Sequence, residues 1–157
     1  MSRLYINILS IVFILLSASC REISIYHANI DIPHESWNLD SIAVFKVDID
    51  DTTAVHNIFV NIRNTNEYPN SNLFLFVQTT SPVGSTLRDT MECILADSRG
   101  KWLGRGFGAI RDNQFPYKKY IRFPEKGTYT LNIQQGMRTS NLKGIASVGL
   151  RVERVKE

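Results

Sequence analysis

The stretch Ser147-Val148-Gly149-Leu150-Arg151-Val152-Glu153, near the end of the chain, decides the fold class. Its apolar side chains, Val148, Leu150 and Val152, occupy alternate positions, with small or charged residues between them. Successive side chains of a β-strand point to opposite faces, so this alternation predicts a strand with one face in a core and the other in solvent. A strand of this kind is typical of an antiparallel sheet.

Six further stretches toward the N-terminus also predict strands. Clusters of turn-forming residues separate them, such as Ser81-Pro82-Val83-Gly84 and Glu125-Lys126-Gly127. Residues 73–77 are apolar throughout, which is expected of a strand covered on both faces. Short strands with turn signals between them predict an all-β fold, an antiparallel β-sandwich of the jelly-roll kind. The six predicted strands are residues 42–49 (with a slip in phase near Phe45), 58–62, 73–77, 89–95, 120–123 and 128–133.

The first twenty residues have the pattern of an export signal. A basic Arg3 precedes the apolar run 8–16, and the small residues Ser17-Ala18-Ser19 lead to Cys20. A cysteine at the cleavage boundary is what a bacterial lipoprotein signal requires, because its thiol receives diacylglycerol. The run is too short to span a bilayer, which takes about twenty residues. Ser17 stands where a leucine is usual, so an ordinary secretory signal is the alternative.

These observations divide the chain into three parts. Residues 1–19 are the predicted signal peptide, residues 20–41 an irregular lipidated leader, and residues 42–157 the β-sandwich domain. The 157 residues are 43% hydrophobic and 21% charged, which suits one ordinary globular domain. The formal net charge is only +3 and the basic residues are interspersed with acidic ones, which argues against a nucleic-acid partner.

A search for catalytic or metal-binding patterns finds none. The histidines His27, His34 and His56 do not have a metal-ligand spacing, and we expect them in solvent or in turns. With Cys20 lipidated, Cys93 has no disulfide partner, and its place in a predicted strand favours a buried, unreactive thiol. We therefore expect no metal, no cofactor and no enzymatic activity.

Two connections have a composition that suits recognition. The asparagine-rich segment 63–72 joins two apolar strands, and segment 96–117 combines aromatic residues with arginines and four glycines. Aromatic residues and arginines are enriched at protein interfaces, although a loop folded over the sandwich edge with its aromatic residues in the core is equally compatible. The candidate partner-binding residues are Tyr68, Asn70, Asn72, Trp102, Arg105, Arg111, Asp112, Asn113 and Tyr117.

An ordered set of short motifs resembles the gliding-motility lipoprotein GldH family of the Bacteroidetes. The set covers nearly the whole mature chain, and its order is more specific than any single motif. It comprises Trp37, the stretch 59–77, Asp89-Thr90-Met91-Glu92-Cys93, Leu95-Ala96-Asp97, Gly100-Lys101-Trp102-Leu103-Gly104, Asp112-Asn113-Gln114-Phe115, Arg122-Phe123-Pro124, Gly127-Thr128-Tyr129 and Met137-Arg138.

The resemblance implies an envelope lipoprotein that supports gliding and the associated secretion of surface proteins, without catalysis or a cofactor. Only Cys20 receives a defined role from it. The family also occurs in species that do not glide, so membership does not imply motility. Only one acidic residue, Glu22, closely follows Cys20, which is a weak surface-export signal, and we expect the outer membrane with the domain in the periplasm.

Two classes of function follow from the sequence. The favoured one is an interaction module, anchored to the membrane by its lipid, that docks onto other envelope motility or secretion proteins. The alternative is a periplasmic sandwich that binds glycan or peptidoglycan and uses exposed aromatic residues such as Trp102 or Tyr117 as stacking platforms.

Overall fold

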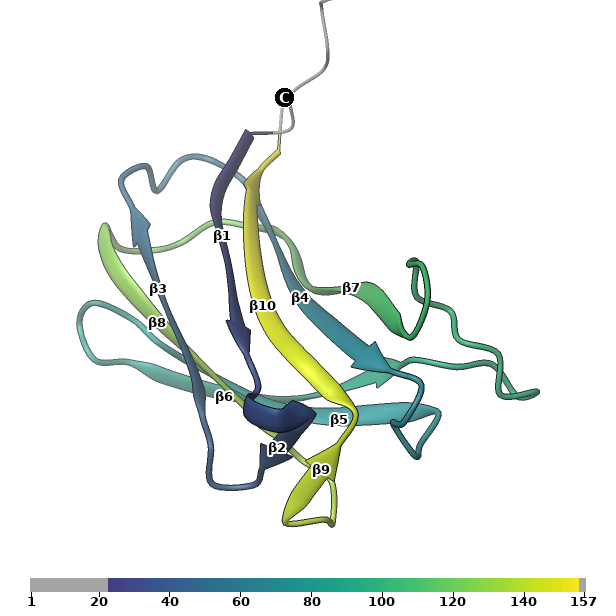
Figure 1. The fold of residues 1–157 in the computed structure, drawn as a ribbon. Coiled ribbons are helices and arrows are strands. Elements are labelled where there is room, and N and C mark those ends of the chain that lie inside the picture. Colours follow the sequence, from purple (N-terminus) through teal and green to yellow (C-terminus); the bar gives the residue numbers. More distant parts are fainter. Residues whose placement is uncertain (1–22, 156–157) are drawn as a thin grey trace, which may run out of the picture.

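The computed structural model describes residues 23–155, so the predicted signal peptide and lipidation site at Cys20 lie outside the described part. The described chain forms two four-stranded antiparallel sheets packed face to face, with a two-stranded ribbon at one end (Figure 1). This arrangement confirms the predicted all-β sandwich. No helix within residues 23–155 has the length and apolar character needed to span a bilayer.

Each of the two sheets takes its strands from widely separated parts of the chain. Sheet 1 has the order β1 (Ile23–Asp31), β10 (Ile145–Arg154), β4 (His56–Thr65) and β7 (Ile110–Ile121). Sheet 2 has the order β3 (Ala43–Ile49), β8 (Gly127–Gln135), β5 (Asn72–Thr80) and β6 (Thr86–Ile94). All neighbours are antiparallel, and β5–β6 is the one pair that is consecutive in sequence. Two interleaved four-stranded sheets of this kind are the architecture of a jelly roll.

The core lies between the sheets and follows the alternation of the strands. Val148, Leu150 and Val152 of β10 are fully buried, as their spacing predicts, and they face the alternate residues of β5 and β8 from sheet 2. Burial of such aliphatic side chains contributes roughly 1.5–3 kcal/mol each, which makes this core the main source of stability. One end is closed by the ribbon of β2 (Ser36–Asn38) and β9 (Asn141–Lys143), which inserts Trp37 and Leu142 into the core.

Four details differ from the sequence-based expectations. Strand β7 runs from Ile110 to Ile121, whereas the sequence predicted a connection over residues 96–117 and a strand only at 120–123. The expected irregular leader is in fact largely ordered: Ile23–Asp31 is edge strand β1, and a short 3-10 turn, η1 (Pro33–Glu35), leads to β2. There is no slip in phase near Phe45, because β3 alternates regularly and leaves Val44 exposed. Strand β5 is covered on one face only, and Phe74 remains 37% exposed on the outer face of sheet 2.

Candidate partner-binding surface

The connection between β6 and β7 is built as two small hairpins in succession, which we call the double hairpin (residues 95–112). The first closes with a bridge between Ala96 and Trp102. Its turn is fixed by Asp97, whose Oδ1 accepts the backbone N–H groups of Arg99 and Lys101, each at 2.9 Å. These hydrogen bonds from the backbone to the Asp97 carboxylate stabilise the turn, although the hairpin has only one bridge between its strands.

The second hairpin closes with a bridge between Arg105 and Asp112. Their backbones exchange two hydrogen bonds, of 2.9 Å and 2.6 Å. Gly106 has a φ of +150°, and a Cβ at this position would lie 2.4 Å from the carbonyl oxygen of Ile110. Only glycine therefore allows the chain to approach itself so closely here.

The double hairpin is attached to the body of the sandwich by Trp102 and by backbone hydrogen bonds. Trp102 packs against the hydrophobic core, and its ring lies 6.5 Å from that of Tyr68. The backbone N–H groups of Leu95 and Ala96 donate to the carbonyl of Ser71, just before β5, at 2.8 Å and 3.0 Å. Side-chain packing and backbone hydrogen bonds together hold the hairpins in one position relative to the sheets.

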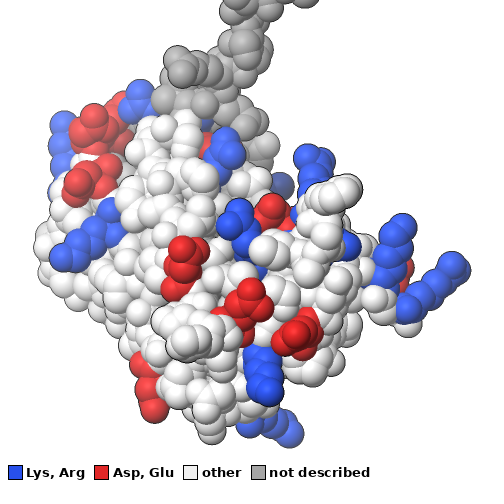
Figure 2. All heavy atoms as spheres, viewed as in Figure 1, with Lys and Arg blue, Asp and Glu red and all other residues white. Residues whose placement is uncertain are grey.

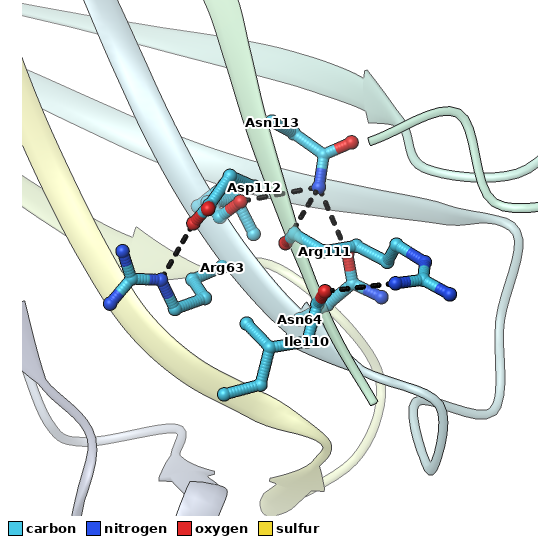
Figure 3. A network of polar contacts seen from close by, with 7 residues as sticks. Arg63, Asn64, Ile110, Arg111, Asp112 and Asn113 are labelled. Atoms are coloured by element: carbon cyan, nitrogen blue, oxygen red, sulfur yellow. Dashed lines mark hydrogen bonds and ion pairs between the residues drawn. The ribbon is translucent and has the colours of Figure 1, made fainter. Parts of the chain in front are cut away.

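A polar network joins the end of the double hairpin to strand β4 (Figure 3). The Arg63 guanidinium forms an ion pair with Asp112 at 2.6 Å. Beneath it, Asn113 donates through Nδ2 to the side-chain oxygen of the fully buried Asn64 at 2.9 Å. Buried carboxamides must satisfy their hydrogen bonds internally, so this pair fixes the register of β7 on β4.

The outer surface of the double hairpin combines apolar and basic side chains. Phe107 at the second turn is fully exposed, Leu103 is 55% exposed, and Ile110 and the adjoining Ile94 are also exposed. The basic residues Arg99, Lys101 and Arg105 are exposed beside them. Figures 1 and 2 show this segment projecting from the sandwich, with Lys and Arg predominating at its surface. We call this set the hairpin surface: Ile94, Arg99, Lys101, Leu103, Arg105, Phe107 and Ile110.

Two of the candidate residues named from the sequence are structural. Tyr68 is only 3% exposed, and its hydroxyl donates to the carbonyl of Asn72 at 2.7 Å. Burial raises the pKa of Tyr68 to about 12. Asn113 is buried in the network with Asn64. The burial of both side chains argues against a partner contact by Tyr68 or Asn113.

The remaining candidates are distributed over several environments. Arg105 is exposed, and Arg111 is half-buried at the start of β7. Asp112 is exposed but held by Arg63, and Asn70 is half-buried in the asparagine-rich connection.

Three further candidates are anchored to the sandwich. Trp102 is half-buried against the core. Asn72 donates to Glu92 at 2.7 Å. Tyr117 packs on the core and donates to Asp89 at 2.6 Å, and burial followed by this carboxylate raises the pKa of its phenol. Neither Trp102 nor Tyr117 has the freely exposed ring that a stacking platform requires.

Sequence reasoning missed the apolar part of the hairpin surface. Leu103, Phe107 and Ile110 are not among the candidates, although Phe107 is flanked by Gly106 and Gly108, both with positive φ. A phenylalanine between two such glycines stands at the tip of a tight turn, where no neighbouring element can cover it. That flanking pair was the available signal.

Two titratable residues outside the surface lie in the core. Cys93 is fully buried, and burial raises its pKa to about 12, as a packing role requires. His56 is also buried, against the ring of Phe123 at 5.3 Å, so the expectation of a solvated turn histidine is wrong here. Within residues 23–155, no group of three or more His, Cys, Asp or Glu side chains is placed to hold a metal ion.

The sequence of this sandwich matches a known protein family. The family model described as GldH lipoprotein matches residues 24–152, which is nearly all of the described sandwich, from β1 to β10. The chain belongs to the GldH lipoprotein family. Membership implies a lipid-anchored protein of the cell envelope connected with gliding motility.

Two curated relatives of this GldH family member agree with the family match. The gliding motility lipoprotein GldH homolog of Christiangramia forsetii is 39% identical over 148 residues, covering 90% of each chain. The gliding motility lipoprotein GldH of Flavobacterium johnsoniae is 38% identical over 125 residues, covering 75% of this chain and 77% of its own. Both are similar along most of the sandwich that carries the hairpin surface.

Proposed function

We propose that this chain is a non-catalytic docking module, tethered by lipid to the outer membrane, that binds another motility or secretion protein in the periplasm through the hairpin surface. The observation that carries the proposal is the fully exposed Phe107, held at the tip of a fixed hairpin among exposed basic residues. Aromatic anchors on pre-ordered loops, with arginines nearby, are the residues that dominate binding energy at protein interfaces.

The position of the tether suits this role. Ile23, the start of β1, follows Cys20 by three residues, which can span about 10 Å at most. The start of β1 lies beside the end of β10, and the double hairpin adjoins the opposite end of sheet 1, where Thr65 pairs with Ile110. A lipid on Cys20 would therefore hold one end of the sandwich at the membrane and direct the hairpin surface away from it.

The surface also suggests what the partner offers. Leu103, Phe107 and Ile110 would enter an apolar recess, and the exposed Arg99, Lys101 and Arg105 would meet carboxylates around its rim. Rim charges mainly govern the rate of association, whereas a buried aromatic anchor governs dissociation. Loss of Phe107 should therefore weaken the complex more than loss of a single rim arginine.

The test is capture of partners from the native envelope. Full-length, lipidated protein carrying Phe107→Asp should recover at most about one tenth of the partner that the parent chain recovers after cross-linking. Val83→Asp is the matched control, because Val83 is equally apolar and 68% exposed at the turn between β5 and β6. If Phe107→Asp captures the same proteins in the same amounts as the parent, the hairpin surface is not the docking site.

A further inference from the structure

The outer face of sheet 1 carries a row of carboxamide side chains. The register pairs Asn29 with Gly149, Gly149 with Asn61, and Asn61 with Gln114, so that one row crosses all four strands. Directly paired residues of antiparallel strands point to the same face. Because Val148 and Leu150 of β10 point into the core, the row on either side of Gly149 points outward.

This row lies in a hollow of about 680 Å³, within the usual size range of ligand sites. His27, Arg63 and Ser147 line it together with the carboxamides, and Gly104 and Arg105 of the double hairpin contribute a wall. Residues of both faces of β7 line the hollow, so it continues around that edge strand. A ligand lying in it could extend across the sheet as a chain.

Gly149 lies between Asn29 and Asn61 in this row. A Cβ at this position would lie 1.9 Å from the side-chain oxygen of Asn29, so glycine is what allows that carboxamide to lie over β10. Gly149 is absent from the glycines with positive φ, and the backbone therefore does not require glycine here. Glycine is needed here because it leaves room for the side chain of Asn29.

The chemistry of the row suits a hydroxyl-rich ligand. Within residues 23–155, the side chains of Asn29, Asn61 and Gln114 make no hydrogen bond to the protein. Each carboxamide can donate and accept, which matches adjacent hydroxyl groups of a sugar ring. Beside the row, Arg63 pairs with Asp112 and Arg151 with Glu153, so these two guanidinium charges are already compensated.

An aromatic ring lies next to the row on the same face. Phe59 precedes Asn61 by two positions on β4, so its side chain points to the same side of the sheet. It is half-buried and paired in register with Arg151 and Pro116. An aromatic ring beside hydrogen-bonding carboxamides offers an apolar surface to the carbon–hydrogen face of a pyranose.

We propose that the outer face of sheet 1 binds a glycan chain through Asn29, Asn61 and Gln114, with Phe59 as the stacking residue. The hollow adjoins the hairpin surface and shares Ile94, Leu103 and Arg105 with it, but the three carboxamides do not belong to that surface. The proposal therefore stands whether or not Phe107 docks a protein. The same chemistry would serve the glycan strand of peptidoglycan or the polysaccharide of the outer surface, and the test distinguishes these two sources.

The experiment is calorimetric titration of the full-length lipidated chain in detergent micelles. One probe is glycan fragments of lysozyme-digested peptidoglycan, and the other is polysaccharide released from lipopolysaccharide by mild acid. Binding of either probe should weaken about tenfold or more in Asn61→Ala/Gln114→Ala. The matched control is Gln78→Ala/Asn132→Ala, a directly paired carboxamide couple on the outer face of sheet 2, which should bind as the parent does.

Three results would overturn the proposal. The first is no heat of binding with either probe, and the second is equal binding by the two double variants. The third is that the parent chain binds no glycan while Asn61→Ala/Gln114→Ala loses a captured protein. Gly149→Ala adds an independent test, because it should weaken glycan binding by displacing Asn29 while every carboxamide is retained. Gln114→Ala alone, on edge strand β7, serves if a variant in a central strand fails to fold.

Discussion

The imidazole of His56 is buried where β4 begins, at the end of the sandwich opposite the double hairpin. Burial, followed by the positive charge of Arg154, lowers its pKa below the ordinary value of 6.5, and the nearby carboxylates Asp50 and Asp51 only partly oppose this. The folded chain therefore holds His56 neutral. As the pH falls below 6.5, His56 takes up a proton in the unfolded chain but not yet in the folded chain. The free energy of unfolding therefore decreases from about pH 6.5 down to the pKa of His56 in the folded chain.

We predict that the urea midpoint of the parent chain falls between pH 7 and pH 5, and that His56→Gln flattens this fall. The carboxyls of Asp51 and Asp89 also have lowered pKa values, but their contribution is lost only below about pH 4, outside the window. His27→Gln, at an exposed position, is the control and should keep the parent slope. An unchanged slope in His56→Gln would show that another group causes the pH dependence.

The thiol of Cys93 provides a second test at the residue scale. Its pKa of about 12 and complete burial mean that almost no thiolate forms at pH 8 in the folded chain. Iodoacetamide should therefore modify Cys93 only after unfolding. Cys93→Ala should lower the free energy of unfolding by about 1 kcal/mol, and Cys93→Ser by more because it buries a hydroxyl. Rapid labelling of the native protein would contradict the packing role.

At the scale of elements, the double hairpin separates residues that hold it from residues that present a surface. Trp102 packs on the core, so Trp102→Ala should lower the free energy of unfolding by about 2 kcal/mol. Arg105→Ala should change it by less than about 0.5 kcal/mol, because that side chain is exposed. Urea denaturation of both variants measures the difference. Equal stability of the two would mean that Trp102 does not anchor the hairpin.

How far the sequence predicts these elements depends on whether their signal is local. The alternation of β10 and the turn signal Glu125-Lys126-Gly127 before β8 are local, and both elements were predicted correctly. Strand β1 was missed because a bulge between Ser24 and Tyr26 interrupts its alternation and leaves Ile25 exposed. In β5, a continuous apolar run does not reveal that the outer face, with Phe74, is uncovered.

The site depends on contacts between distant segments, which one sequence does not reveal. The second hairpin closes only because Gly106 lets the chain approach Ile110, and the carboxamide row exists only because β1, β10, β4 and β7 are neighbours in that order. Composition did identify segment 96–117 as important. It could not separate Trp102, which is anchored to the core, from Phe107, which is exposed.

At the scale of the whole molecule, the proposed lipid anchor holds the sandwich at one end, and the proposed partner surface lies near the other. Cys20→Ser should move the protein from the membrane fraction to the aqueous fraction while the sandwich still folds, because no described strand includes residue 20. Fractionation with a near-ultraviolet circular dichroism spectrum measures both properties. Full retention in the membrane fraction would show that something other than a lipid on Cys20 anchors the chain.

The most direct test of the docking account is photo-crosslinking in living cells. A photoreactive phenylalanine analogue would replace Phe107 in one strain and Val83 in another, both in the full-length lipoprotein, with products identified by mass spectrometry. Docking through Phe107 predicts a discrete cross-link from position 107 to one envelope protein connected with gliding or secretion, and none to that protein from position 83. Identical products from both positions, or none from position 107, would contradict it.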